Sequence, residues 1–428
     1  MRNRTARSHR FTPFAFVMAL GLSGCAQDDA PPSRSTTAPA PGATPGGAVS
    51  RYEIGEPEAV SGDFASVNAI RARPDGSLLV ADGTGGELVL LDLDLGTRTV
   101  VGGRGQGPGE YQAPSRVWPL PGDSTLLLDF GNNRLTVLTP DLAFGATRPM
   151  LEIDPAAGVL MLNPQAIDAS GRMYTTNGFS MNLPGAGAGG GSGSDSIPVV
   201  RATLDDLSPD TVATLAPRST SRVEMRSNQG NRMVTMQRTP YSASDSWGVA
   251  PDGSVAVARA ADYHLEWISS DGSVQSGAPV AWDAVPVGQA EREAWVREQS
   301  SQTVQTATFV TGGGGGASSA AGMAGSAART MAFGGASDDV DDYEWPETLP
   351  PFTGRILIDP EDRAWLRRHQ PVGAPFLYDI FTPDAEHAGT VEIAEGHTVM
   401  GFGDGVVYAT FRDEVDLVYI ARYSLPEM

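Results

Sequence analysis

Turn signals recur along the chain at a spacing in the forties, and this period constrains the fold more than any other feature. The first turn of each copy falls at Gly76, Gly122, Gly171, Gly253, Asp362 and Gly405, at intervals of 46, 49, 82, 109 and 43 residues. Short apolar or alternating runs flank each turn, which is the pattern of strands joined by tight turns. The two long intervals correspond to one repeat plus an insertion.

Each copy has room for four short strands. The copy from Val67 reads "VNAIRARPDGSLLVADGTGGELVLLDLDLGTRTVV", with turn signals at 74–77, 83–86 and 95–97. A period in the forties with four strands per unit is typical of a β-propeller blade. The sequence therefore predicts an all-β fold, a six-bladed β-propeller of four-stranded blades. The alternative of two packed β-sandwiches does not explain the sustained period.

The last copy, from Thr398, supplies only three strands. We expect "RYEIGEPEAV", which starts at Arg51, to supply the fourth strand, so that the N-terminal strand closes the ring and removes exposed edges. The prediction is one domain over 51–428 with insertions at about 177–196 and 285–351. Within the second insertion, 289–302 reads as an amphipathic helix around Trp295, and 311–335 as a disordered low-complexity stretch.

The first 24 residues have the order of a secretory signal. Four arginines come first without any acidic residue, and an apolar run of about 12 residues and several small residues follow. A run of this length is too short to span a bilayer, which requires roughly 20 residues. Residues 25–50 are rich in Ala, Pro, Ser, Thr and Gly, which predicts a flexible tether.

The single cysteine of the chain stands in Leu22-Ser23-Gly24-Cys25, which resembles the lipobox of bacterial lipoproteins. The resemblance implies cleavage before Cys25 and a diacylglycerol on its sulfur, so that the thiol has no redox role. An ordinary signal peptide with a chance cysteine is the alternative. Because no aspartate directly follows Cys25, the family's sorting rule implies the outer membrane, with the protein lipid-anchored in the bacterial cell envelope.

One stretch, "GGRGQGPGEYQAPSRVWPLPGDSTLLLDFGNNRLTVL", contains a glycine-rich loop and a later Asn-Asn-Arg turn. It resembles the NHL-repeat family of six-bladed propellers, and more closely the bacterial lipoproteins that share this fold. The residues that carry the resemblance are Gly103, Gly105, Gly107, Gly109, Tyr111, Pro114, Asp129, Asn132, Asn133 and Arg134. The resemblance supports the fold much more than any activity, because propellers host unrelated functions.

The charge of the chain excludes several classes of function. The formal net charge is −21, so nucleic acid is not expected as a partner. The sequence contains no lysine, which excludes a Walker P-loop, a Schiff-base lysine and a lysine general base. The glycine-rich loop has the wrong spacing for a phosphate cradle and connects two strands, so we interpret it as structural.

The extra sequence of this chain is expected on one face of the disc, which often marks the binding side. The segment 217–244 is rich in arginine, whose planar fork suits an anionic ligand, although pairing with the protein's own carboxylates is the alternative. The candidate binding residues of this face are Arg104, Glu110, Tyr111, Arg116, Arg218, Arg222, Arg226, Arg232 and Arg238. An anionic ligand or an envelope protein is the expected partner.

Signatures of catalysis are scarce. We find no nucleophile elbow and no zinc motif, and four histidines of the mature chain stand at no ligand spacing. The acidic stretch 338–345 lacks the pattern of an EF-hand and is interpreted as a solvated loop rather than a calcium site. Binding or scaffolding without a cofactor is therefore favoured.

The alternative is a metal-dependent lactonase or lyase. It rests on a resemblance to gluconolactonase-type propellers, which hold a divalent cation in the central channel. Calcium or zinc would then lie near the starts of the inner strands, and the candidate ligands are Asp63, Asn68, Asn163 and Gln165.

Overall fold

The computed structural model describes residues 50–154, 158–176, 180–181, 196–217, 219–226, 232–299 and 339–428. All of them belong to one compact unit, Pro41–Met428. The predicted signal, Cys25, most of the tether, Arg218 and the low-complexity stretch 311–335 lie outside the described residues.

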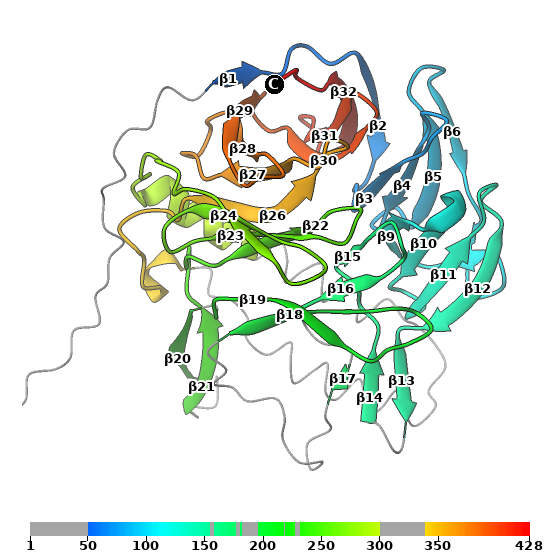
Figure 1. The fold of residues 1–428 in the computed structure, drawn as a ribbon, viewed down its shortest axis with the longest axis horizontal. Coiled ribbons are helices and arrows are strands. Elements are labelled where there is room, and N and C mark those ends of the chain that lie inside the picture. Colours follow the sequence, from blue (N-terminus) through cyan, green and yellow to red (C-terminus); the bar gives the residue numbers. More distant parts are fainter. Residues whose placement is uncertain are drawn as a thin grey trace, which may run out of the picture. The chain divides into compact units, whose positions relative to one another are not determined.

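The described residues form an all-β ring of six blades, each built on four antiparallel strands (Figure 1). Blade 1 contains β3 (Ala69–Ala72), β4 (Leu78–Asp82), β5 (Glu87–Asp92) and β6 (Thr97–Val100). Blade 2 contains β9 (Pro114–Pro119), β10 (Thr125–Asp129), β11 (Arg134–Leu138) and β12 (Phe144–Pro149). Blade 3 contains β15 (Ala166–Ile167), β16 (Met173–Thr175), β18 (Ile197–Ala202) and β19 (Asp210–Leu215).

The second half of the ring repeats the same order of strands. Blade 4 contains β22 (Ser246–Val249), β23 (Val255–Arg259), β24 (His264–Ile268) and β25 (Val274–Ser276). Blade 5 contains β26 (Phe352–Ile358), β27 (Ala364–Arg368), β28 (Phe376–Phe381) and β29 (His387–Ile393). Blade 6 contains β30 (Thr398–Gly403), β31 (Val406–Arg412), β32 (Val418–Ser424) and β2 (Ala59–Phe64). The predicted six-bladed propeller is confirmed.

The core lies between the blades. Every residue of β4 is buried, and its side chains alternate between the two neighbouring blades because successive residues of a strand point to opposite faces. Leu78 and Val80 pack in a cluster with blade 6, whereas Leu79 and Ala81 pack in a cluster with blade 2. The six large apolar clusters each join one pair of consecutive blades. This packing makes neighbouring blades mutually dependent.

The six turns that define the repeat all adopt the same backbone conformation. Each lies between the first and second strands of its blade and has a positive φ, from 57° at Asp362 to 89° at Gly253. Glycine occupies five of these positions because it adopts positive φ without a Cβ clash. Asp362 occupies the sixth, and aspartate tolerates this region better than most residues. The periodic glycines in the sequence therefore report a backbone requirement.

The ring closes through the N-terminal segment as predicted, but the closing strand begins later than Arg51. Strand β2 (Ala59–Phe64) pairs antiparallel with β32 and completes blade 6. Residues Arg51–Glu53 form β1 instead, which pairs parallel with β29 and adds a fifth strand to blade 5. The N-terminal segment therefore ties two blades together rather than one.

Buried hydrogen bonds also join adjacent blades. Asp379 in β28 is 0% exposed and accepts hydrogen bonds from Arg368, His387 and Thr390 of its own blade. The hydroxyl of Tyr263, from blade 4, donates to the same carboxylate. Burial alone raises the pKa of Asp379, but the hydrogen bonds from His387 and Arg368 outweigh it and hold the pKa below its usual value.

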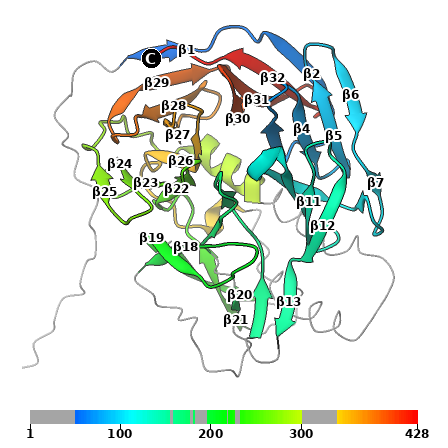
Figure 2. The same ribbon diagram turned by 45° about the vertical axis from the view of Figure 1, so that its right-hand side comes forward.

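The connections on one face carry additional strands. Short β7 (Gly103–Arg104) and β8 (Glu110–Tyr111) pair within the glycine-rich loop. Strands β13 (Leu151–Asp154), β14 (Gly158–Met161) and β17 (Ser180–Met181) form one small sheet, and β20 (Thr220–Arg226) pairs with β21 (Arg232–Arg238). Figures 1 and 2 show these two additions on the same side of the ring. Because β17 belongs to the blade 3 insertion and β14 to the connection between blades 2 and 3, their pairing places both on one face.

Candidate functional site

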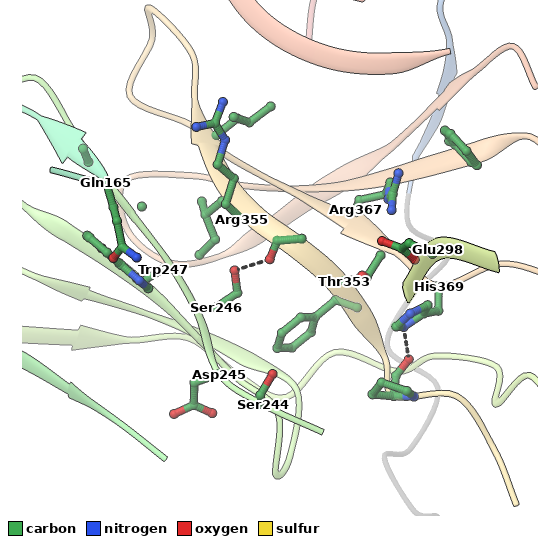
Figure 3. Close-up of a pocket in the computed structure, with 18 of the residues that line it drawn as sticks. Gln165, Ser244, Asp245, Ser246, Trp247, Glu298, Thr353, Arg355, Arg367 and His369 are labelled. Carbon is green, nitrogen blue, oxygen red and sulfur yellow. Dashed lines mark hydrogen bonds between the residues drawn. The ribbon is translucent and has the colours of Figure 1, made fainter. Parts of the chain in front are cut away.

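A cavity of about 1120 Å³ runs along the central channel. The inner strands of four blades line it, namely β9, β15, β22 and β26. Figure 3 shows Gln165, Trp247 and Arg355 around this space, with Arg367 and His369 farther along it. The cavity therefore combines aromatic surface with arginines and with the carboxylates of Asp245, Glu298 and Glu395.

A short helix covers one end of this cavity. Residues 289–299 are helical, and Ala294, Trp295, Glu298 and Gln299 line the cavity. This confirms the predicted amphipathic helix over the part that the structure describes, and Trp295 is 7% exposed. The first part of the second insertion is thus an ordered cap of the channel.

Aromatic rings hold this cap in place. The ring centroid of Trp295 lies 4.9 Å from that of Tyr343 and 5.7 Å from that of Trp345. Tyr241 extends the cluster from the connection before blade 4, with its hydroxyl donating to the carbonyl of Glu291 at 2.6 Å. Tyr343 and Trp345 belong to the acidic stretch that we interpreted as a solvated loop. Its described aspartates are exposed, but its aromatic residues are the core of the cap.

Two arginines project into the channel from different blades. Arg116 lies in β9 of blade 2 and Arg355 in β26 of blade 5. Both line the large cavity, and both also line a second cavity of about 360 Å³ beside blades 1 and 2. Arg116 is a candidate from the sequence and Arg355 is not, because nothing local in the sequence distinguishes an inner-strand arginine that faces the channel.

His369 lines the cavity near the end that the helix 289–299 covers. It was not among the site residues predicted from the sequence. Its Nδ1 lies 2.8 Å from the carbonyl oxygen of Pro350, so the ring donates there and its Nε2 is an acceptor when neutral. Burial lowers the pKa of His369 to about 4. The imidazole is therefore neutral at physiological pH. Nearby Arg367 packs its guanidinium over the ring of Phe376 at 4.9 Å.

The four metal candidates do not come together. Asp63 lies in β2, the outermost strand of blade 6, and not at the start of an inner strand as predicted. Asn68 lines the smaller cavity and Gln165 the larger one, whereas Asn163 lines neither. The amide oxygens of Asn68 and Gln165 already accept hydrogen bonds from Ser66 and Thr176.

No group of three His, Cys, Asp or Glu side chains that could hold a metal ion occurs in the part of the chain described here. Asn68, Asn163 and Gln165 are amides and do not belong to such a group, so a calcium or zinc ion at these residues stays a prediction. We derive no catalytic step through one.

The glycine-rich loop is held by the residues that carry the NHL resemblance. The carboxylate of Asp129 accepts from the backbone of Gln112 and Ala113, and Asn132 donates to the carbonyl of Gly105 at 2.9 Å. The guanidinium of Arg134 donates to the carbonyl oxygens of Gln106 and Glu110. These contacts agree with the interpretation of the loop as structural.

The residues of the glycine-rich loop that we proposed for binding differ in how accessible they are to a ligand. Arg104 is exposed, but the Glu110 carboxylate accepts from the backbone of Gly107 at 2.7 Å. Tyr111 does not project toward the channel mouth as expected, because it is 1% exposed and packs in the cluster between blades 1 and 2. Its hydroxyl accepts from the Leu88 backbone at 2.9 Å. The aromatic position of this motif is a core position.

The arginine-rich segment forms the hairpin β20–β21 and not an irregular loop. Arg226 and Arg232 are direct partners in its register, Arg222 is opposite Met236, and Arg238 is opposite Thr220. The hairpin connects blades 3 and 4 on the insertion-bearing face. An anionic ligand at these arginines remains a prediction.

The other three histidines of the blades lie in ordinary structural contacts. His264 approaches Asp262, His387 approaches Asp379, and His397 stacks on Phe411 with ring centroids 4.3 Å apart. No helix among the described residues is long and apolar enough to cross a membrane.

Comparisons with known proteins add little beyond the fold. No protein-family model matches the chain, and no curated protein matches it. A member of the DUF4221 family from Bacteroides vulgatus is similar at 8% identity and a TM-score of 0.42, over 86% of this chain and 99% of that one.

Two further solved structures are similar over most of their length. A catalytically inactive virginiamycin B lyase from Staphylococcus aureus, solved with quinupristin, has 9% identity and a TM-score of 0.36, over 86% of this chain and 99% of its own. The calcium-binding protein regucalcin from Agrobacterium tumefaciens has 11% identity and a TM-score of 0.32, over 89% of this chain and 98% of its own. At such identities the similarity concerns the fold alone, and the strand pairing described above is what establishes that fold.

Proposed function

We propose that this protein is a binding module of the bacterial cell envelope whose capped central channel takes a small solute. The observation that carries the proposal is the cavity of about 1120 Å³, lined by four inner strands and covered by the helix 289–299. Ligand sites are typically concave, mostly preformed and of roughly 300–1,000 Å³, with a few polar groups among aromatic ones. Here Trp118, Trp247 and Phe352 supply the aromatic surface.

The polar groups of this cavity favour holding a ligand over transforming it. The Ser246 hydroxyl donates to the carbonyl of Gly354 at 2.7 Å, and the Asp245 carboxylate is 2.9 Å from Arg259. His369 is neutral and its Nδ1 is engaged with Pro350. The protein itself engages these three groups, so they hold the shape of the cavity rather than act on a ligand.

We further propose that the propeller is displayed on a lipid anchor at Cys25, in the outer membrane. The proposal rests on the lipobox-like Leu22–Cys25 and the tether that follows. We expect Cys25 to be the first residue of the mature chain and to carry acyl chains, as detected by mass spectrometry of the N-terminal peptide. In a Cys25→Ser variant the protein should leave the membrane fraction. An unmodified Cys25 would refute the anchor and leave the binding proposal intact.

The binding proposal is tested by tryptophan fluorescence, because Trp118, Trp247 and Trp295 line the cavity. Titration with a panel of neutral and anionic sugars and ring compounds should give saturable quenching by at least one member. A Thr353→Trp variant, which fills the cavity from β26, should lose this binding. If no member of the panel quenches saturably, or if binding survives in the filled variant, the channel is not the binding site.

A further inference from the structure

The two channel arginines face one another across the ring. Blades 2 and 5 are opposite in a ring of six consecutive blades, and Arg116 and Arg355 lie on their inner strands. Because both line both cavities, they stand at the place where the larger and the smaller cavity meet. A solute that fills the larger cavity therefore lies beside these two guanidinium groups.

Neither guanidinium forms an ion pair with the residues described here. Arg116 approaches only the carbonyl oxygen of Gln165, with its Nη1 at 3.5 Å, and Arg355 makes no hydrogen bond to a described residue. The chain has 51 acidic residues, and the side chains of all but six are described. Those six are Asp28, Asp29, Asp154, Asp195, Glu224 and Asp338. In a protein with such a surplus of carboxylates, two unpaired channel arginines call for an explanation.

An anion between the two guanidinium groups would improve the surroundings of both. Arg355 is exposed to the solvent of the channel, although the walls of the channel lower its pKa by desolvation. The positive charge of Arg116 lowers the pKa of Arg355 further, and burial lowers that of Arg116. Desolvation and a nearby like charge both disfavour the charged form of a base, and an anion between the two groups would relieve both effects.

The surroundings indicate what kind of anion fits. The planar guanidinium matches the two oxygens of a carboxylate, and such bidentate pairs are among the strongest hydrogen bonds in proteins. Trp118 and Trp247 line the same cavity and offer apolar ring surface beside the arginines. A cavity of about 1120 Å³ leaves room for the body of the ligand toward the cap.

We propose that Arg116 and Arg355 form a carboxylate-binding site across the central channel, which takes an organic acid whose sugar-like or aromatic ring packs against Trp118 and Trp247. This inference rests on the proposed function and names the class of its ligand. The ligand carboxylate bridges the two blades, and the rest of the molecule extends toward the helix 289–299.

The first test measures the stability of the ligand-free protein. Arg355→Met should leave the melting temperature within about 1 °C of the wild type, because the exposed guanidinium has no ion pair to lose. The matched control is Arg363→Met in the same blade, since the Arg363 guanidinium is paired with Asp359 at 2.7 Å. That control should lower the melting temperature. If Arg355→Met is as destabilising as Arg363→Met, Arg355 is a structural arginine and the inference fails.

The second test uses pairs of probes that differ only in charge. D-glucuronate and benzoate should bind the wild-type protein at least about tenfold more tightly than D-glucuronamide and benzamide. Arg116→Met and Arg355→Met should each abolish this preference, whereas Arg98→Met in the exposed outer strand β6 should retain it. Equal binding of acid and amide would refute the carboxylate site and leave the proposed function standing. If neither member of either pair binds, the carboxylate site is refuted, and the proposed function fails as well only if no compound of the fluorescence panel binds.

Discussion

The arginines between the blades and the arginines in the channel have opposite surroundings. Arg368 donates two hydrogen bonds to Asp379, Arg363 donates to Asp359, and Arg172 donates to Asp168, all at 2.6–2.9 Å. Each of these three carboxylates is at most 1% exposed. Arg116 and Arg355 have no such partner among the described residues.

The paired arginines stabilise the propeller, whereas the unpaired channel arginines are available to bind a ligand. A buried charge without a partner is costly, so an inter-blade arginine needs its own carboxylate. A channel arginine can remain unpaired because water reaches it and a ligand can complete its hydrogen bonds. Four predictions test the comparison.

Removal of a buried partner should have the largest effect. Asp379→Ala leaves Arg368, His387 and Tyr263 without their shared acceptor, so we expect the free energy of unfolding to fall by about 3–5 kcal/mol. Urea unfolding followed by circular dichroism measures this. Asp210→Ala is the control, since its carboxylate is 61% exposed and its pair with Arg201 should contribute less than about 1 kcal/mol. Similar losses in the two variants would contradict the distinction.

His369 should make the stability depend on pH. Its pKa is about 4 in the folded protein and 6.5 in an unfolded chain, so the unfolded state binds more protons between these values. Stability should therefore fall as the pH drops from 6.5 toward 4, by about 2 kcal/mol at pH 5 for this residue.

The measurement is urea unfolding at pH 7.5 and pH 5. His369→Asn retains a donor toward the Pro350 carbonyl but cannot be protonated, so most of this loss should disappear. His264→Asn is the control and should keep the pH dependence of the wild type. An unchanged loss in His369→Asn would show that other groups cause it.

Tyr111 extends the comparison to the rim of the channel. Tyr111→Phe leaves the buried Leu88 amide without its acceptor, which should cost about 1–2 kcal/mol of unfolding free energy. Because the ring is a core element, binding of D-glucuronate should not change. If the Tyr111→Phe variant has normal stability but binds D-glucuronate more weakly, Tyr111 belongs to the ligand site and not to the core.

Removal of divalent cations should have the smallest effect. The described residues bring no three metal-binding carboxylates or imidazoles together, so EDTA should shift the melting temperature by less than about 1 °C. Differential scanning fluorimetry with EDTA, and then with excess calcium or zinc, measures this. A clear fall with EDTA that calcium or zinc restores would favour the metal-dependent lactonase or lyase instead.

Local patterns in the sequence determined the architecture. The number of blades, the four strands of each and the six turns of positive φ follow from the alternation of side chains and the spacing of glycines. These features depend on residues close together in the chain. The same holds for the helix at 289–299, whose apolar side was visible as a period of 3.6 residues.

Only the tertiary structure decided which residues meet in the channel. That Arg355 is opposite Arg116, that His369 lies under the cap and that Tyr343 packs on Trp295 all depend on segments far apart in sequence. The alternation of apolar and polar residues along a strand indicates toward which face of its blade a side chain points. It does not indicate which distant side chain it faces, because that depends on the closure of the ring and the register of every strand between them.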